Sequence, residues 1–138
     1  MANASLDKNS RPTTTITVVG PKGERNLTAI IDTGFDGFLS IPSDELQKVG
    51  LPGSITVTGT AVLADNRSIP VRLCLTPVRL DREEQVGMCI IASPTGDAFV
   101  GMSFLLAFHK KLIVDVTNDF ADLAVSDYQS PRSSASGY

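Results

Sequence analysis

Residues 30–41 read IIDTGFDGFLSI, a stretch that sets one carboxylate between two apolar runs. Asp32 ends an apolar strand and is followed by a small hydroxyl residue and a glycine. Apolar surroundings perturb the protonation of a carboxylate, and perturbed groups concentrate at functional sites. The tripeptide also suits an ordinary strand-ending turn, in which Asp32 caps the backbone and Gly34 supplies a positive φ angle. Residues 32–34 alone leave both interpretations open.

A β-hairpin is predicted immediately before Asp32. Residues 13–19 are rich in β-branched side chains, residues 20–23 form a Gly-Pro-Lys-Gly turn, and residues 25–31 return as a second strand. The hairpin therefore delivers Asp32 at a strand end, where a rigid scaffold can present a reactive loop residue. After the loop, residues 38–41 predict another short strand.

Two short helices are predicted. The first opens at residues 42–45 with Ser43 as its N-cap and acidic residues in its first turn, and Gly50 ends it. The second is the apolar run at residues 101–108. Four residues are expected on the core side of this second helix: Met102, Leu105, Leu106 and Phe108.

The second half of the chain is otherwise rich in alternating apolar and polar residues, which predict strands. These strands lie at residues 55–58, 69–75, 71–80, 85–91, 112–116 and 120–125. Residues 64–67 form one hairpin tip and residues 81–84 form another turn. If the second turn places Val78 opposite Gln85, the same register places Cys74 opposite Cys89.

The length of 138 residues fits one domain of ordinary globular composition. Residues 1–11 are expected to be a disordered leader and residues 129–138 a disordered tail, which leaves residues 12–128 as the domain. The fold class is mostly β with one or two short helices.

Composition excludes several classes of function. The net charge of −3 and the lack of a basic cluster longer than Lys110-Lys111 argue against nucleic-acid binding. No apolar run approaches the roughly 20 residues that span a bilayer, and the polar N-terminus lacks a signal peptide, so we expect a cytoplasmic protein. Cys74 and Cys89 are too few for a zinc motif and are expected to be free thiols. We therefore expect no metal and no cofactor.

The order of these motifs resembles the retropepsin-like (retroviral-type) aspartic protease family. Asp32-Thr33-Gly34 is similar to the catalytic loop of that family, and residues 62–69 lie where the family has its flap hairpin. Residues 93–97 match the wall loop, Phe99-Val100-Gly101 the signature that follows it, and residues 101–105 the Gly-Met-x-x-Leu helix start. The resemblance covers residues 13–125 and implies a small closed β-barrel-like fold.

The resemblance also implies a role for each site residue. Asp32 would be the catalytic aspartate, Thr33 would brace the two loops of a dimer, and Gly34 would let a substrate backbone come close. Because one chain holds a single Asp-Thr-Gly and the chemistry needs two carboxylates, we expect a homodimer. Its substrate would be an extended peptide or an unfolded protein. The residues expected to contact that substrate are Phe35, Asp36, Leu63, Ala64, Asp65, Asn66, Thr95, Gly96, Asp97, Phe99 and Val100.

Three of these positions keep a second interpretation. Phe35 stands where the family usually has a small residue, so it either reshapes the subsite beside Asp32 or packs in the core. Asp36 either binds the substrate backbone or is a structural turn carboxylate. Asp97 also suits an ordinary solvated loop.

Competing functions differ in what they require. A dimeric peptide-binding module could keep this fold without turnover. A serine hydrolase based on Ser103 lacks the glycine that the nucleophile-elbow motif requires at position 105, and His109, the single histidine, lies on the same helical run. A phosphate-binding loop at residues 19–23 lacks the P-loop spacing. An aspartic endopeptidase active as a homodimer is the function that the sequence favours.

Overall fold

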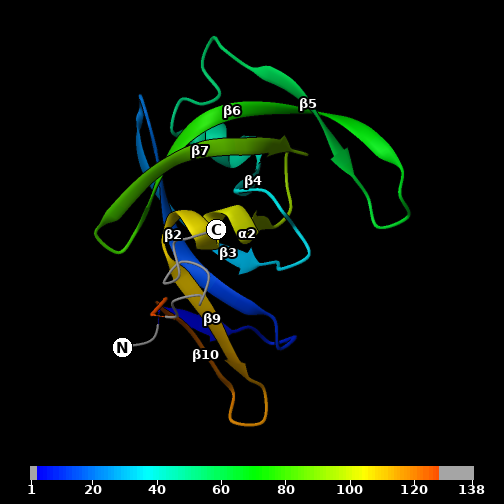
Figure 1. The fold of residues 1–138 in the computed structure, drawn as a ribbon. Coiled ribbons are helices and arrows are strands. Elements are labelled where there is room, and N and C mark those ends of the chain that lie inside the picture. The colour runs from blue at the N-terminus through cyan, green and yellow to red at the C-terminus, as the bar shows by residue number, and fades with distance from the viewer. Residues whose placement is uncertain (1–2, 128–138) are drawn as a thin grey trace, which may run out of the picture.

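The computed structural model describes residues 3–127, which form ten strands and two short helices (Figure 1). The strands are β1 (Ala4–Leu6), β2 (Pro12–Gly20), β3 (Gly23–Ile31), β4 (Leu39–Pro42), β5 (Val57–Val62), β6 (Ser68–Leu80), β7 (Glu83–Ala92), β8 (Ala98–Val100), β9 (Lys110–Asp115) and β10 (Phe120–Val125). The helices are α1 (Ser43–Lys48) and α2 (Met102–Ala107). No helix among residues 3–127 has the length and apolar character needed to cross a membrane.

Six strands close into a barrel. The sheet order runs β1-β2-β3-β8-β4-β7-β6-β5, and an additional β2–β6 pairing joins β6 back to β2. The ring therefore consists of β2, β3, β8, β4, β7 and β6, with β1 and β5 attached outside it. Strands β9 and β10 form a separate two-stranded sheet. In Figure 1 the β5–β6 hairpin and the β9–β10 hairpin project from different sides of the barrel.

The hairpin predicted before Asp32 is confirmed. Strands β2 and β3 pair from Thr13↔Ile30 to Gly20↔Gly23, because β-branched residues favour strands and the Pro-Lys pair turns the chain. Ile16 and Val18 point into the core at 0% and 1% exposure, so the period of two in β2 decides which side faces inward.

The core side predicted for α2 is partly wrong. Phe104, Leu105 and Phe108 are buried, whereas Met102 and Leu106 are 45% and 74% exposed. Phe104 packs against Phe38 and Phe108 with ring centroids 5.7 and 4.6 Å apart. Met102 and Leu106 stand one helical turn apart, so they share the opposite face of this six-residue helix.

The expected disordered leader at residues 1–11 is wrong for the described part, residues 3–11. Strand β1 pairs with β2 from Ala4↔Thr14 to Leu6↔Pro12. The backbone N–H of Asn3 donates to Asp122 Oδ1 at 3.1 Å, so this segment also contacts β10. The pairing of β1 with β2 is a local hairpin that the polar composition of residues 1–11 concealed, whereas the contact with Asp122 joins segments far apart along the chain. The tail predicted at residues 129–138 lies outside the described residues.

The N-cap predicted for α1 is also wrong. The helix begins at Ser43, its N-cap is Pro42, and no side chain caps it by a hydrogen bond. Asp44 and Glu45 lie in the first turn as expected, where their negative charges interact favourably with the positive end of the helix dipole. The helix ends at Lys48 with Val49 as its C-cap, and Gly50 follows with a φ angle of +85°.

The register predicted for the β6–β7 hairpin is confirmed. Val78 pairs with Gln85 and Cys74 with Cys89, although the turn is only residues 81–82. Both cysteines are buried and free. Burial raises the pKa of the Cys89 thiol to about 12, and the neighbouring Cys74 adds to the increase.

We therefore expect both thiols to be inert in the folded protein. A thiol reacts as its thiolate, which burial of Cys89 suppresses at mildly alkaline pH. A disulfide-exchange reagent such as Ellman's should label the native protein negligibly and label both cysteines once guanidinium chloride unfolds it. The exposed variant Ser54→Cys serves as a positive control for reagent access. Fast labelling of the native wild type would contradict the expected burial.

Candidate active site

The aspartate loop, defined here as residues 32–37, starts where β3 leaves the barrel. Strand β3 pairs in parallel with β8 from Ala29↔Ala98 to Ile31↔Val100, and the N–H of Asp32 donates to Val100 O at 2.9 Å. Thus β8 fixes the backbone of Asp32. Its side chain is exposed in the single chain, in contrast to the apolar surroundings that its sequence neighbours predicted.

The carboxylate of Asp32 is oriented by its own loop. The N–H of Gly34 donates to Asp32 Oδ1 at 2.9 Å, and the N–H of Phe35 donates to Asp32 O at 3.1 Å. Within residues 3–127, Oδ2 of Asp32 accepts no hydrogen bond. One oxygen is therefore held and the other is free to meet a water or a second carboxylate.

The aspartate loop rests on the start of α2. The N–H of Met102 donates to Phe35 O at 2.8 Å, and the N–H of Ser103 donates to Asp36 O and Gly37 O at 3.2 and 3.1 Å. The Ser103 hydroxyl also donates to Asp36 O at 2.6 Å. A Cβ atom on Gly101 would overlap the carbonyl oxygens of Phe35 and Gly37. Only glycine permits this approach.

A cleft of about 620 Å³ opens beside the aspartate loop. Residues 34–39 line one side and residues 60–62 of β5 line the other, with Leu73, Met88 and Ile90 between them. Ser103 also lines it. Extended peptides suit such a cleft, because apolar side chains line it and a hairpin borders it.

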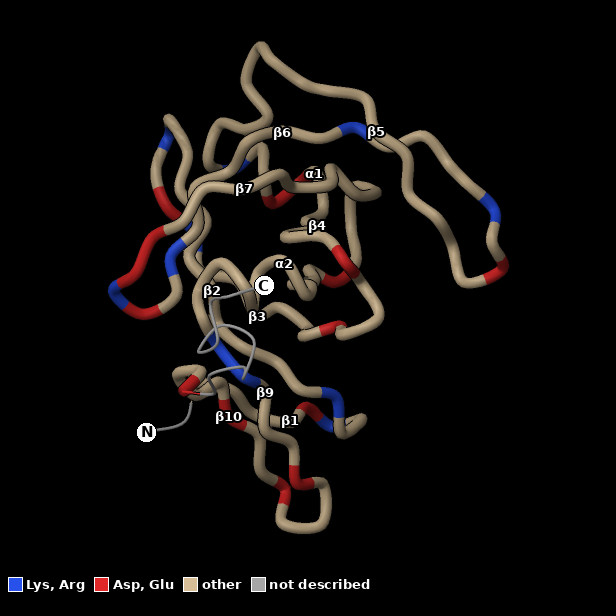
Figure 2. Tube along the Cα trace, in the orientation of Figure 1, with Lys and Arg blue, Asp and Glu red and all other residues tan. Residues whose placement is uncertain are grey.

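The β5–β6 hairpin lies where the flap was predicted, but its tip does not line the cleft. Leu63 and Arg67 close the tip through a backbone hydrogen bond of 2.8 Å, and Arg67 Nε bonds Asp65 Oδ2 at 2.6 Å. Figure 2 shows these opposite charges together at the tip, while β5 itself carries none. The contacts expected of Leu63, Ala64, Asp65 and Asn66 therefore stay predictions.

Thr60 and Ala61 are cleft residues that the sequence reasoning missed, whereas Val62 was expected as the start of the flap hairpin. The predicted strand stopped at residue 58, whereas β5 continues to Val62 and pairs with β6 as far as Ser68. Its alternation of small and apolar residues was the available signal. Thr60, Ala61 and Val62 face the aspartate loop across the cleft.

The predicted wall loop lies apart from the cleft. Thr95, Gly96 and Asp97 are exposed, and none of them lines it. Phe99 instead lines a second hollow of about 430 Å³, together with Asp32 and Thr33. The expectation that Val100 contacts a substrate is wrong, because its side chain is fully buried.

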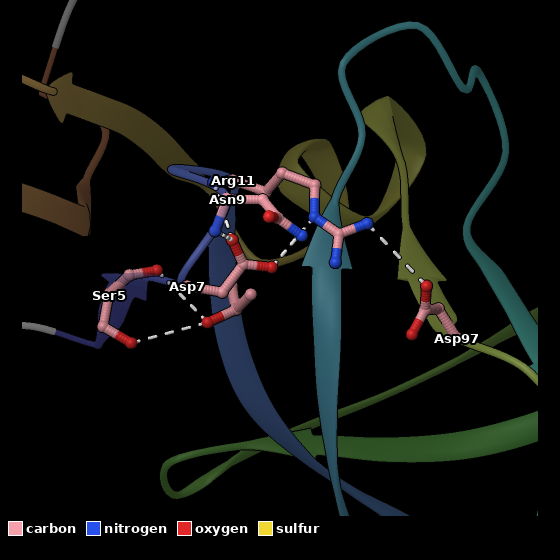
Figure 3. A network of polar contacts seen from close by, with 6 residues as sticks. Ser5, Asp7, Asn9, Arg11 and Asp97 are labelled. Carbon is pink, nitrogen blue, oxygen red and sulfur yellow. Dashed lines mark hydrogen bonds and ion pairs between the residues drawn. The ribbon is translucent and has the colours of Figure 1, made fainter.

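Arg11 is a further residue at this second hollow that the sequence reasoning missed. Its Nε donates to Asp7 Oδ2 at 2.9 Å, and Asp7 Oδ1 accepts the N–H groups of Asn9 and Arg11 at 2.9 Å each. The backbone hydrogen bond from Arg11 is the main reason that the pKa of Asp7 is lowered. Figure 3 shows the Arg11 side chain extending from the turn between β1 and β2 toward Asp97, and its Nη1 lies 3.8 Å from Asp97 Oδ2. These contacts join the N-terminal hairpin to the predicted wall loop.

A third hollow, of about 460 Å³, adjoins Thr33. We call its lining the Thr33 face, which consists of Thr33, Met102, Leu105, Leu106, Lys110, Lys111 and Leu112. Strand β9 also exposes Ile113 and Val114, at 40% and 43%, and Val114 lines the second hollow. Met102 and Leu106 make the Thr33 face a candidate interaction surface.

Two other chemistries find little support in the described part of the chain. Residues 3–127 contain no group of three or more His, Cys, Asp or Glu residues that could hold a metal ion. The hydroxyl of Ser103 donates to a backbone carbonyl rather than to a base, and no hydrogen bond in the same residues joins it to His109. The arrangement of a serine hydrolase is therefore absent there.

Structural comparison decides the fold. The EIAV protease in complex with the inhibitor HBY-793 superposes with a TM-score of 0.61 and 15% identity over 80% of this chain and 99% of that one. The chain has the retropepsin fold. A retropepsin-like aspartic protease from Rickettsia conorii also superposes on it, with a TM-score of 0.61 and 16% identity over 88% of this chain and 91% of the other. No family model and no curated protein matches the sequence.

The retropepsin fold confirms the predicted fold class, mostly β with a closed barrel and two short helices. Identity of 15% to 16% carries the fold alone.

Ser103→Ala tests the role of this serine. We expect a loss of about 1 kcal/mol in unfolding free energy, because the hydroxyl bond to Asp36 O disappears. Urea denaturation measures the loss. Any peptide hydrolysis should survive, since the hydroxyl positions a loop and attacks nothing. Abolished hydrolysis in a folded Ser103→Ala protein would restore the serine-hydrolase alternative.

Proposed function

We propose that the chain is an aspartic endopeptidase that hydrolyses peptide bonds as a homodimer. One observation carries the proposal. Asp32 lies exposed on a loop that β8 and α2 hold rigidly, and the loop borders an apolar cleft beneath a β-hairpin. The two structural relatives are proteases, which supports the same assignment.

The chemistry requires Asp32 of each subunit beside a shared water. Two carboxylates close enough to share one water cannot both ionise, so the pair holds one proton and titrates as a unit. The charged member takes a proton from the water, and the protonated member polarises the scissile carbonyl. The N–H of Gly34 would keep Oδ1 of each carboxylate in place.

The Thr33 face supports the dimer. The sequence contains a single Asp-Thr-Gly, so the second carboxylate has to come from a second copy. Met102 and Leu106 expose apolar surface next to Thr33. Covering that surface with its symmetry mate would bring the two aspartate loops together and remove the apolar area from water.

The cleft supports an extended peptide substrate with apolar side chains. Phe35, Phe38, Val62 and Leu73 line it, so apolar residues should flank the cut. A peptide between β5 and the aspartate loop can bond to their backbones as an added strand. Asp36 lines the same cleft, and its carboxylate makes no hydrogen bond or ion pair within residues 3–127. It is therefore available to the N–H groups of a substrate.

Asp32→Asn should abolish cleavage of a diverse peptide pool while leaving the fold intact. Asparagine has the same shape and can still accept the N–H of Gly34, but it cannot act as a base. We expect hydrolysis to fall by at least about a thousandfold, measured by mass spectrometry across acidic to neutral pH. Equal cleavage by both proteins would refute the role of Asp32. Peptide binding without cleavage by the wild type would favour the alternative, a silent binding module.

Mixing subunits tests the homodimer. A large excess of Asp32→Asn protein should suppress wild-type activity, because most wild-type chains would then pair with an inactive partner. Leu106→Glu, introduced into the Asp32→Asn protein, should prevent this suppression. Leu106 is 74% exposed in the single chain, and in the dimer the new charge would be buried in the contact. Ile55→Glu, at 77% exposure, is the matched control and should leave suppression unchanged. Cleavage by a protein that sediments as a monomer would contradict the dimer.

A further inference from the structure

The ring of Phe35 occupies the space above a glycine in the cleft. A Cβ atom on Gly37 would lie 2.5 Å from Phe35 Cε1 and 2.6 Å from Cζ. A Cβ atom on Gly101 would lie 2.7 Å from Phe35 Cδ2. The ring thus lies over the backbone of both glycines, and Phe35 remains only half-buried because it also lines the cleft.

The backbone under the ring is fixed. The carbonyl of Phe35 accepts the N–H of Met102 at 2.8 Å, and Ser103 bonds the carbonyls of the next two residues. The ring cannot retreat from the cleft, because the backbone of Gly37 and Gly101 lies directly behind it. Its remaining freedom is movement toward the cleft.

We propose that the Phe35–Gly37 pair sets the size limit of the substrate subsite beside Asp32. The proposal rests on the proposed peptidase function and specifies its substrate class. The ring takes the volume into which a substrate side chain would otherwise extend. The peptide residue that packs on Phe35 is therefore small as well as apolar: alanine or glycine. Larger apolar residues fit further along the cleft, against Leu73, Met88 and Ile90.

This role differs measurably from simple packing. A ring that only stabilises the loop would, on removal, reduce the rate for every peptide by the same factor. A ring that limits a subsite changes the preference between small and large residues at one peptide position and leaves other positions alone. In hydrophobic pockets a single methylene changes the specificity ratio by about 10–200-fold.

The experiment compares peptides that are identical except for alanine or leucine at each position in turn. At one position, the wild type should favour alanine by at least about tenfold in kcat/KM, and Phe35→Ala should remove or reverse this preference. Phe35→Leu should give an intermediate ratio and guards against misfolding of the alanine variant. The ratios at the other positions are the internal control.

Gly37→Ala supplies the second arm of a double-mutant cycle. Its methyl group should push the ring into the cleft and lower kcat/KM for the alanine peptide by about tenfold. In the Phe35→Ala background the same methyl group meets no ring, so it should have little effect. This non-additivity is the signature of direct contact between the two residues. Additive effects would overturn the proposal.

Binding separates this inference from the peptidase function. The same peptides are titrated by calorimetry into each variant carrying Asp32→Asn. A shift in the alanine-to-leucine affinity ratio without any wild-type cleavage would support the subsite and refute the peptidase. Cleavage with an unchanged ratio in Phe35→Ala would refute the subsite alone. Absence of both binding and cleavage would overturn both.

Discussion

The hydrogen bonds between the aspartate loop and the first turn of α2 are the constraint on which the site depends. A helix start leaves N–H groups without partners inside the helix, and here the carbonyls of Phe35, Asp36 and Gly37 accept those of Met102 and Ser103. The loop therefore acts as the cap of α2, whose N-cap residue, Gly101, offers no side-chain hydrogen bond. Because Gly101 lets the two backbones come so close, one arrangement satisfies the helix start and also fixes the reactive loop.

The barrel and the β5–β6 hairpin contribute differently to the cleft. Parallel pairing of β3 with β8 holds Asp32 rigidly, since both strands lie inside the closed ring. Strand β5, in contrast, pairs only with β6 and extends outside the ring. A two-stranded hairpin has little stability of its own, so it can move while the barrel stays fixed. The cleft thus lies between the closed barrel and a hairpin that extends beyond it.

Two of the exposed apolar residues, Met102 and Leu106, lie beside Thr33, where the proposed chemistry needs a second carboxylate. The chain contains a single Asp-Thr-Gly, and the Thr33 face beside it leaves Leu106 mostly in water. A second copy on this face would supply the second carboxylate and cover Leu106 together. In such a dimer, the ring of Phe35 over Gly37 would limit the size of the subsite beside Asp32 in each subunit.

The sequence by itself determined the elements whose signals are local. Alternating side chains and turn residues placed Asp32 at the end of β3 and paired Cys74 with Cys89, because strand period and turn length fix a hairpin's register. Only the tertiary structure decided that β1 joins the sheet, that Arg11 reaches Asp97, and that α2 buries Phe104 while exposing Leu106. The last two outcomes arise from contacts between segments far apart along the chain, and β1, although it pairs with the next strand, lies beside Asn3, which bonds Asp122. No local pattern records such contacts, because the same residues would suit either environment until the barrel closes around them.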